Sequence, residues 1–402
     1  MKQLFLYDDA KARGFEPFAL TRPVSELRAG AEIIRARWER ASGSAASGFF
    51  AAAHLDNFDE AGAPGSARGA ETLPPGTLIA NSRCVVALDA TVDDTSPVFN
   101  CDGDVCAVRI RQTIDARGLA DGSVSLERLA GGGAATEIRG RWLAEVWDLV
   151  GDLDAQLVDD IPLLGARLSG AAVENATVVG KRGVFCETGA SIEPFVVLDA
   201  SNGPILIRRG ATISSFTRIV GPCYIGENST IVGDAIRGCS IGDVCKVRGE
   251  ISGSVMLGHS NKGHTGFVGS SYIGRWVNLG AGTTTSNLKN TYGAIHLETR
   301  SGLRDTGLQF LGSLIGDHAK TGIGMLLTTG CVVGAGANVF GGGISPKSVP
   351  PFAWGDGEPY DRYDKAKFAS VAERMMARRH VTLTEKGRRH LQDSFDASEP
   401  SR

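Results

Sequence analysis

Two histidines stand in the densest collection of chemically capable side chains in this sequence, the run HSNKGHTGFVGSSYIGRWVNLGAGTTTSNLKN between His259 and Asn290. The run also holds two lysines and several side-chain amides. A neutral imidazole can take the proton from an amine that attacks a thioester. An N–H group or an Asn amide can stabilise the oxyanion that then forms, by about 3 kcal/mol. These residue types predict acyl transfer to an amine, with His264 as the functional imidazole and His259 as a polar residue at a corner of the fold.

The motif lies within a repeat in which hydrophobic residues recur every six positions, and this repeat indicates the fold that positions it. The spacing joins Ile213, Ile219, Ile225 and Ile231, and then Ile241 to Val247, Ile273 to Leu279, and Val333 to Val339. A period of six fits neither an α-helix nor the alternation of a β-sandwich. It fits a parallel β-helix, in which each short strand points one aliphatic side chain inward and three strands make a coil of about 18 residues. We expect this structure from about Val178 to Val349, with a projecting loop where the repeat breaks at Leu288–Gly307.

The first part of the chain predicts an α/β domain. The segments Gln3–Tyr7, Leu78–Val86 and Val105–Ile110 are apolar enough for strands, and apolar positions recur at helical spacing from Glu26 to Trp38. A strand, a loop and a helix in this order begin nucleotide-binding domains. Residues 41–72 show little periodicity, whereas residues 143–150 and 154–164 favour helices. We divide the chain into an α/β domain (1–165), a β-helix domain (166–352) and a helical tail (353–402).

The composition excludes several classes of protein. The net charge of −3 gives no reason to expect nucleic acid or an anionic membrane as a partner. No apolar run approaches the length that spans a bilayer, and the first residues are too polar for a signal peptide. The eight cysteines form no Cys-x-x-Cys pair and no zinc-finger spacing. We therefore expect a cytoplasmic protein with reduced thiols.

The motifs resemble a known family. NKGHTGFVG followed by NLGAGTTTSN is similar to the acetyltransferase domain of the bifunctional UDP-N-acetylglucosamine pyrophosphorylase/glucosamine-1-phosphate N-acetyltransferases, and more closely to a divergent bacterial branch of them. The opening DDAKARGFEPFALTRPVSELRAG resembles the N-terminal domain of the same branch. The resemblance covers nearly the whole chain outside residues 41–72. It implies a left-handed β-helix, although left-handed crossovers depart from the usual rule for parallel strands.

The resemblance also implies roles for individual residues of the β-helix. His264 would be the general base, Glu250 the carboxylate that orients it, and Asn287 a residue near the acetyl-CoA thioester. Three further substrate contacts are implied: Asn278, Lys289 and Arg237. The chain departs from the family at Phe267, where the family has a Tyr, and at Ser252, where it has a Lys. Lys262 could supply the missing positive charge from another direction, so acyl transfer is expected but the acceptor sugar is left open.

The N-terminal domain lacks the Gly-x-Gly-Thr-Arg-Met run with which such nucleotidyltransferases hold a triphosphate. Six side chains are candidates to replace it or to serve the same site. Arg13 and Arg22 could bind phosphate as bidentate donors, and Asn81 and Arg83 could contact the nucleotide or the sugar. Asp102 or Asp104 could hold Mg²⁺. All of these could equally be loop and capping residues.

The implied function has two steps. Acetyl-CoA would acetylate the amine of a hexosamine 1-phosphate, and the product would then be coupled to a nucleoside triphosphate with the help of Mg²⁺. The implied assembly is a homotrimer. Two alternatives are open: a nucleotidyltransferase whose β-helix serves only for assembly, and a non-catalytic trimer that binds a sugar nucleotide.

Overall fold

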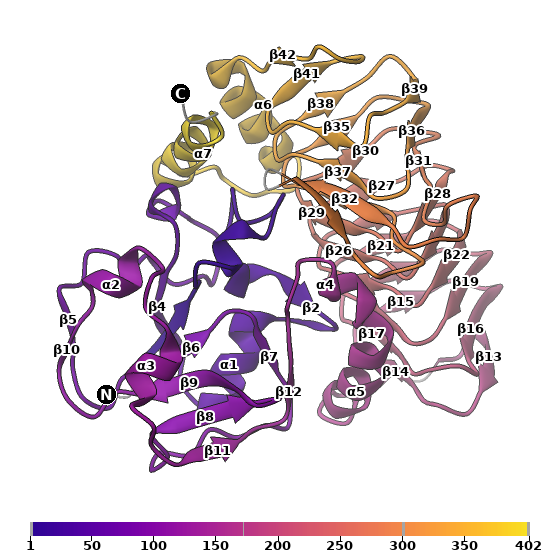
Figure 1. The fold of residues 1–402 in the computed structure, drawn as a ribbon. Coiled ribbons are helices and arrows are strands. Elements are labelled where there is room, and N and C mark those ends of the chain that lie inside the picture. Colours follow the sequence, from indigo (N-terminus) through magenta and orange to yellow (C-terminus); the bar gives the residue numbers. More distant parts are fainter. Residues whose placement is uncertain (1–2, 172, 300–301, 400–402) are drawn as a thin grey trace. The chain divides into compact units, whose positions relative to one another are not determined.

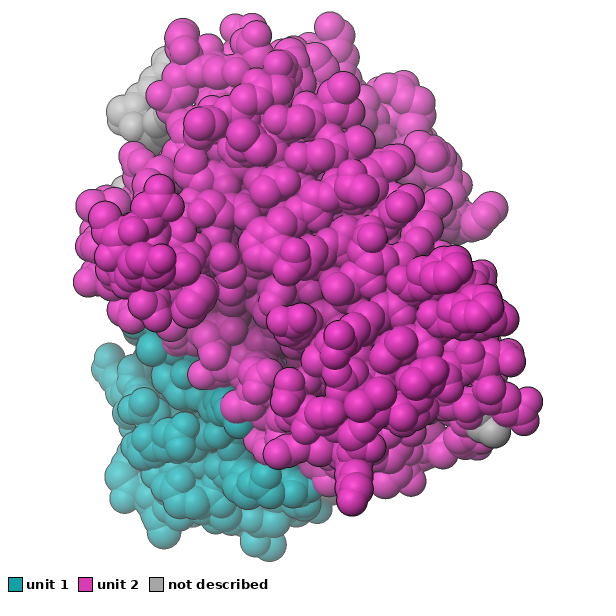
Figure 2. Space-filling model, turned by 90° about the vertical axis from the view of Figure 1, so that its right-hand side faces the viewer, with its two compact units in different colours: residues 1–146, 383–402 teal, residues 147–382 magenta. Residues whose placement is uncertain are grey.

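The computed structural model describes residues 3–171, 173–299 and 302–399. The chain forms two compact units, one of residues 1–146 with 383–402 and one of residues 147–382 (Figure 2). These units divide the chain differently from the sequence segments 1–165, 166–352 and 353–402. The difference arises because two helices at the segment ends pack within the other unit, as described below.

The first unit is built around a mixed six-stranded sheet (Figure 1). Its strands, in spatial order, are β11 (Ala135–Glu137), β8 (Val98–Cys101), β9 (Asp104–Arg109), β6 (Leu78–Asn81), β1 (Leu4–Tyr7) and β4 (Ala46–Phe50). Strand β1 pairs in parallel with both β4 and β6, so the chain moves to opposite sides of β1 in turn. In α/β proteins such a switch point places ligands at the carboxyl ends of the strands. Asp8 and Asp9 follow β1 at that edge, and the predicted residues Asn81 and Arg83 lie at the end of β6 and just after it.

Several short elements complete this unit. They are β2 (Arg28–Ala29), β3 (Glu32–Ile33), α1 (Ile34–Ser42), β5 (Thr72–Leu73), β7 (Cys84–Val86), β10 (Ile114–Asp115), α2 (Arg117–Ala120), α3 (Leu126–Ala130), β12 (Gly140–Trp142) and the three 3₁₀ turns η1 (Ala12–Gly14), η2 (Val24–Glu26) and η3 (Ala53–Leu55). The helix expected from Glu26 begins only at Ile34, because β2 and β3 form a hairpin before it. Strand β4 was not expected, since only Phe49 and Phe50 of its residues are large and apolar.

The second unit is a three-sided parallel β-solenoid, which confirms the repeat interpretation. One face carries β13 (Ala176–Gly180), β16 (Val196–Ala200), β19 (Thr217–Val220), β22 (Asp234–Arg237), β25 (Glu250–Ser252) and β28 (Phe267–Gly269), followed by β31 (Thr284–Thr285), β36 (Met325–Leu327) and β39 (Gly343–Ile344). The isoleucines of the six-residue period, Ile213, Ile219, Ile225 and Ile231, are all buried in one core cluster.

The other two faces complete each coil. The second carries β14 (Val184–Cys186), β17 (Ile205–Ile207), β20 (Cys223–Ile225), β23 (Ser240–Ile241), β26 (Val255–Gly258), β29 (Tyr272–Arg275), β34 (Ser313–Ile315), β37 (Cys331–Val333) and β40 (Ser348–Val349). The third carries β15 (Ser191–Ile192), β18 (Thr212–Ile213), β21 (Thr230–Ile231), β24 (Lys246–Val247), β27 (Asn261–Lys262), β30 (Asn278–Leu279), β35 (Lys320–Thr321), β38 (Asn338–Val339), β41 (Ala353–Gly355) and the antiparallel β42 (Asp361–Arg362).

The repeat breaks where the sequence indicates. After β31 the chain leaves the coil and forms an antiparallel pair, β32 (His296–Thr299) and β33 (Gly302–Asp305), before β34 resumes the solenoid. Helices α4 (Asp148–Gly151) and α5 (Leu153–Gly165) lie at the start of the second unit, and residues 143–147, also expected to be helical, are not. Within the described residues, no helix is both long and apolar enough to cross a bilayer.

The C-terminal tail is helical but serves both units. Helix α6 (Lys365–Ala377) packs on the last coils through Phe368, whose ring meets those of Phe352 and His318. Helix α7 (Glu385–Ala397) belongs to the first unit. There His390 lies against the ring of Phe58 and bonds the Thr21 carbonyl, 2.8 Å away, while Asp393 accepts a hydrogen bond from Asn57.

Candidate functional sites

A groove of about 530 Å³ opens on the first face of the solenoid. Its lining residues are Phe216, Asp234, Ala235, Gly249, Glu250, Thr265, Gly266 and Phe267. Glu250 and Phe267 begin adjacent strands and pair in register, so both side chains leave the face at the same level. The predicted carboxylate and the residue that replaces the family's Tyr therefore share one groove.

The turn that carries His264 forms one end of this groove. His264 is exposed and lies between β27 on the third face and β28 on the first face. The next two residues, Thr265 and Gly266, line the groove. A base on this turn stands one residue from the groove wall, beside the strand that begins with Phe267. The structure thus brings the His264 turn and Glu250 to one site.

Lys262 lies inside the solenoid and not in the groove. Its side chain is fully buried, and its Nζ donates to the carbonyl oxygens of His264 at 2.5 Å and of Thr265 at 2.9 Å. Burial lowers the pKa of the Lys262 ammonium to about 8. This placement differs from the predicted role of Lys262 as a substrate contact, because the ammonium faces the main chain of the turn.

Asn287 lies over the strand that contains Phe267. Its Nδ2 donates to Ser270 Oγ at 3.2 Å. A Cβ added at Gly269 would lie 2.6 Å from Asn287 Nδ2 and 2.4 Å from the Phe267 ring, so both side chains occupy the space above this glycine. The predicted thioester residue therefore packs beside the groove residue Phe267.

The remaining predicted substrate contacts are spread around the coil. Asn278 is on the third face, where its Oδ1 accepts a hydrogen bond of 2.8 Å from Asn261 Nδ2. Lys289 is half-buried at the base of the inserted hairpin, bonded to the Ala294 carbonyl and 3.4 Å from His296 Nδ1. Arg237 is exposed at the far end of β22, in register with Ser252. None of the three lines the groove.

Phe216 and Asp234 line the groove but were not found in the sequence. They stand just before β19 and at the start of β22, the two strands that precede Glu250 on this face. The step from Ile236 to its partner Ile251 is shorter than the step from Ile219 to Ile236. Because the coils differ in length, a fixed six-residue spacing does not bring these positions into line.

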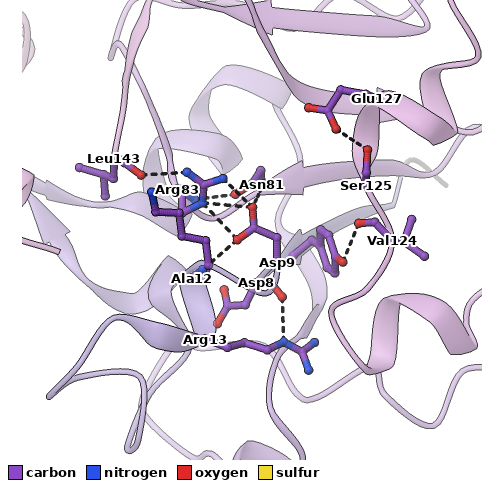
Figure 3. A network of polar contacts seen from close by, with 12 residues as sticks. Asp8, Asp9, Ala12, Arg13, Asn81, Arg83, Val124, Ser125, Glu127 and Leu143 are labelled. Atoms are coloured by element: carbon purple, nitrogen blue, oxygen red, sulfur yellow. Dashed lines mark hydrogen bonds and ion pairs between the residues drawn. The ribbon is translucent and has the colours of Figure 1, made fainter. Parts of the chain in front are cut away.

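In the N-terminal unit, Asp9 and the predicted residues Asn81 and Arg83 form a polar network at the carboxyl edge of the sheet (Figure 3). Asp9 Oδ2 accepts from Arg83 Nη2 at 2.7 Å and from Asn81 Nδ2 at 2.9 Å. Arg83 also donates to the Leu143 carbonyl and lies over the ring of Trp142. Burial would raise the pKa of Asp9, but the hydrogen bonds from Arg83 and Asn81 outweigh it and hold that pKa below its ordinary value.

The two arginines expected to bind phosphate are held by internal partners. Arg13 donates to the carbonyl oxygens of Asp8, Leu119 and Ala120 at 3.0–3.1 Å. Arg22 is almost fully buried and forms a two-pronged pair with Glu60, at 2.8 and 3.2 Å. These placements differ from the predicted role, because the N–H donors of each guanidinium form hydrogen bonds with acceptors of the protein itself.

Asp8 is a buried carboxylate beside this network. It follows β1 directly, is only 2% exposed, and its Oδ2 accepts a hydrogen bond of 3.0 Å from the Val24 N–H. Burial, opposed by hydrogen bonds from Ser82 and the Val24 N–H, raises the pKa of Asp8 to about 6. A carboxyl group with a raised pKa at a switch point marks a candidate functional position.

Asp102 and Asp104, expected to bind Mg²⁺, belong to a surface turn. Asp102 and Gly103 both have positive φ, 53° and 87°, and connect β8 to β9, with Cys101 facing Asp104 in register. Both aspartates are exposed. Asn or Asp followed by Gly is the usual signature of such a two-residue hairpin turn. The turn accounts for the Asp-Gly pair, and Mg²⁺ binding by Asp102 or Asp104 stays a prediction.

The comparisons with known proteins agree with this division into two parts. Residues 4–168 match the family model described as "Sugar nucleotidyl transferase". A bifunctional sugar-1-phosphate nucleotidylyltransferase/acetyltransferase of Sulfurisphaera tokodaii is 31% identical, over 41% of this chain and 42% of its own length. The bifunctional protein GlmU of Desulfitobacterium hafniense is 31% identical over 41% and 39%, and that of Methanococcus vannielii 28% identical over 50% and 43%. The chain thus spans about two fifths of the length of these relatives.

The chain also matches solved structures over about half of its length. A UDP-N-acetylglucosamine acyltransferase of Arabidopsis matches 52% of this chain and 80% of its own, with 12% identity and a TM-score of 0.33. Residues 4–168 thus match a sugar nucleotidyl transferase family model, part of the chain is similar to bifunctional nucleotidylyltransferase/acetyltransferases, and a parallel β-solenoid forms most of the second unit.

Proposed function

We propose that this protein transfers an acetyl group from acetyl-CoA to the amine of a hexosamine 1-phosphate and then couples the product to a nucleotide. One observation carries the acetyl-transfer half. A single groove is lined by Glu250 and Phe267 and bounded by the turn that bears His264. The naming of the sequence relatives as nucleotidylyltransferase/acetyltransferases supports the pairing of the two reactions.

The proposed chemistry uses the solenoid residues in separate roles. His264, neutral, takes a proton from the acceptor ammonium, and the freed amine attacks the thioester carbonyl carbon. Glu250 orients the imidazole and stabilises its protonated form. The Asn287 amide lies where it can donate to the oxyanion of the tetrahedral intermediate. Collapse of the intermediate breaks the C–S bond, the departing thiolate takes the proton back from His264, and the second proton of the attacking nitrogen is released to solvent.

We propose a homotrimer because the solenoid exposes apolar side chains. Phe195 and Phe216 are 72% and 77% exposed, and their rings stack at 5.5 Å with an interplanar angle of 3°. Ile323 and Ile344 are 74% and 75% exposed. Exposed apolar side chains that gather on a surface, as in the Phe195–Phe216 stack, favour a protein interface. The substitution Phe216→Asp should shift the mass measured by sedimentation from three chains toward one, whereas an unchanged mass would argue against an interface at this stack.

For nucleotidyl transfer, we propose the carboxyl edge of the N-terminal sheet, where Asp8, Asp9, Asn81 and Arg83 lie. The residues do not form a built Mg²⁺ site: within the described part of the chain, no group of three His, Cys, Asp or Glu side chains could hold a metal ion. Asp102 and Asp104 sit in an exposed turn. The proposed nucleotidyl transfer therefore includes no step at a metal held by these residues.

A second candidate function is favoured by the arginines of this unit. Arg13, Arg22 and Arg83 are all bound to internal carbonyls or carboxylates. A domain with its guanidinium groups occupied in this way would bind a sugar nucleotide without turning it over. Pyrophosphate release from a nucleoside triphosphate and an N-acetylhexosamine 1-phosphate, set beside calorimetric binding of the sugar nucleotide, separates the two candidates: binding without release selects the second.

A cytoplasmic location is part of the proposal. All eight cysteines are free and buried. Free thiols suit a reducing compartment, where acetyl-CoA and nucleoside triphosphates are also supplied.

Thiol release from acetyl-CoA tests the acetyl-transfer half. We expect release by the full chain only when glucosamine 1-phosphate is present, and a loss of at least about 100-fold in His264→Ala. The control is His380→Asn, which replaces an exposed histidine at positive φ by a residue that tolerates that conformation. Retained activity in His264→Ala would remove this histidine from the mechanism. No release by the folded wild type would refute acetyl transfer to this sugar phosphate.

A further inference from the structure

We propose that Lys262 is a positioning residue, which holds the turn of His264 from inside the solenoid by binding the main-chain carbonyls of that turn. This inference rests on the proposed acetyl transfer. It assigns a role in that reaction to a buried residue that does not itself line the groove.

Lys262 occupies an inward position that the two neighbouring coils fill with aliphatic side chains. Its partner in register on the preceding coil is Val247, which is fully buried in the solenoid core. On the following coil, Asn278 pairs with Asn261, so the inward position there belongs to Leu279, which is 1% exposed. A lysine at such a position removes an ammonium from water, which costs several kcal/mol unless hydrogen bonds compensate.

The compensating hydrogen bonds all lead to the His264 turn. Lys262 Nζ lies 2.5 Å from the carbonyl oxygen of His264 and 2.9 Å from that of Thr265. The Thr265 carbonyl also accepts a bond of 3.1 Å from the Gly282 N–H on the next coil. The turn is therefore tied both to the interior and to the coil that follows it, while the His264 side chain stays exposed.

The space for the ammonium is provided by a glycine. A Cβ added at Gly266 would lie 3.1 Å from Lys262 Nζ and 2.3 Å from the Thr283 carbonyl oxygen. Gly266 has a φ of 128° and lines the groove on its outer side. The ammonium thus lies directly beneath the stretch of backbone that joins His264 to Phe267. Its loss would therefore shift the position of these residues where they border the groove.

The chain offers a matched control in Lys320. Its Nζ donates to the carbonyl oxygen of His318, two residues earlier, at 3.0 Å, and burial lowers its pKa to about 8, as it does for Lys262. Lys320 is on the same face of the solenoid, but on the coil after the insertion, and it does not line the groove. Substitution of Lys320 therefore measures how much the loss of a partly buried ammonium destabilises the solenoid, without a change at the His264 turn.

The experiment compares Lys262→Met, Lys262→Gln and Lys320→Met in the full-length protein. Met fills a volume close to that of the lysine stem without a donor, and Gln keeps an N–H donor for one of the two carbonyls. We expect both Met variants to melt at lower temperature. We expect kcat for acetyl transfer to fall about 10- to 100-fold in Lys262→Met alone, with KM changed less than about twofold, because a small misplacement of a catalytic group has this effect. Lys262→Gln should lie between Lys262→Met and the wild type, and it keeps the comparison available if Lys262→Met does not fold.

A second measurement does not depend on activity. In protein labelled with ¹⁵N-histidine, the imidazole signals of His264, assigned with His264→Ala, should be sharp in the wild type and in Lys320→Met. They should be broadened or multiplied in Lys262→Met. Unchanged His264 signals together with an unchanged kcat would overturn the proposal, as would a rise in KM at constant kcat, which would make Lys262 a substrate contact. If the wild type transfers no acetyl group, the proposed function fails, and the signals alone decide whether Lys262 positions the turn.

Discussion

Arg83 forms an ion pair with Asp9 at the carboxyl edge of the N-terminal sheet. Its Nη2 lies 2.7 Å from Asp9 Oδ2, and its Nε lies 3.1 Å from both carboxylate oxygens. The pair is mostly buried, with side-chain exposures of 12% and 18%. Removal of one partner would leave the other charged, half-desolvated and unpaired. The pair therefore fixes the loop after β1 to the loop after β6, the two segments that flank the switch point.

Arg83→Ala should therefore lower the free energy of unfolding of the N-terminal unit by about 2–4 kcal/mol. Denaturant titration measures the loss. The control is Arg117→Ala, which breaks an equally close pair with Asp115 on the surface, where exposures are 82% and 53%. That variant should leave the midpoint unchanged, since exposed pairs contribute little. Equal effects in the two variants would show that burial of the Asp9 pair is unimportant.

Acid should loosen helix α7 through His390. Burial lowers the pKa of His390 to about 4, from an ordinary value of 6.5, so the folded protein holds this imidazole neutral. The unfolded state binds the proton more readily, so the contribution of His390 to stability is complete above about pH 6.5 and declines as pH falls toward 4. From pH 7.5 to pH 5 the expected loss is about 2 kcal/mol.

The matched variant for this pH effect is His390→Gln, which keeps an N–H donor for the Thr21 carbonyl but does not titrate. Asp8 acts in the opposite direction, because its raised pKa makes the folded state bind the proton more readily between about pH 4 and pH 6. Comparison of the variant with the wild type cancels the Asp8 effect. Hydrogen exchange of the α7 amides should show a steeper pH dependence in the wild type than in His390→Gln. Identical slopes would contradict the assignment.

Gly269→Ala should impair acetyl transfer while the solenoid stays folded. The new methyl group would lie 2.4 Å from the Phe267 ring and 2.6 Å from Asn287 Nδ2, and both side chains would have to move. We expect kcat/KM to fall at least about 10-fold, because two groups beside the groove are displaced together. Gly293→Ala is the control in the neighbouring insertion: its Cβ meets nothing closer than 3.9 Å, and this variant should keep full activity.

Deletion of residues 383–402 should destabilise the N-terminal unit, although the deleted residues are more than 230 positions away in sequence from its other parts. The deletion removes His390 from the ring of Phe58 and Asp393 from the side chain of Asn57. Thermal unfolding monitored through Trp38, which is buried in this unit, should occur at a lower temperature. A truncation after residue 399 should have no such effect. Unchanged unfolding of the longer deletion would mean that α7 only rests on this unit.

The sequence predicted the solenoid well because its signal is local and repeated. Each coil requires an inward aliphatic side chain at each face, and Ile219, Ile225 and Ile231 meet that requirement on three successive faces. The sites were predicted less completely, because a residue type does not reveal its partner. Arg22 was predicted to bind phosphate, but its guanidinium pairs with Glu60. Lys262 was predicted to supply positive charge to the substrate, but its side chain is buried in the solenoid. The place of α7 could not be foreseen, since its contacts with Thr21 and Asn57 span almost the whole chain.

The membership of α7 in the first unit has a consequence for how the protein is made. Synthesis proceeds from the N-terminus, so β1, β4 and β6 leave the ribosome long before Glu385–Ala397 exist. During that interval Phe58 and the loop around Thr21 have no helix to cover them, while the solenoid can already form coil by coil. The unit that emerges first therefore completes its packing only after Glu385–Ala397 have been made.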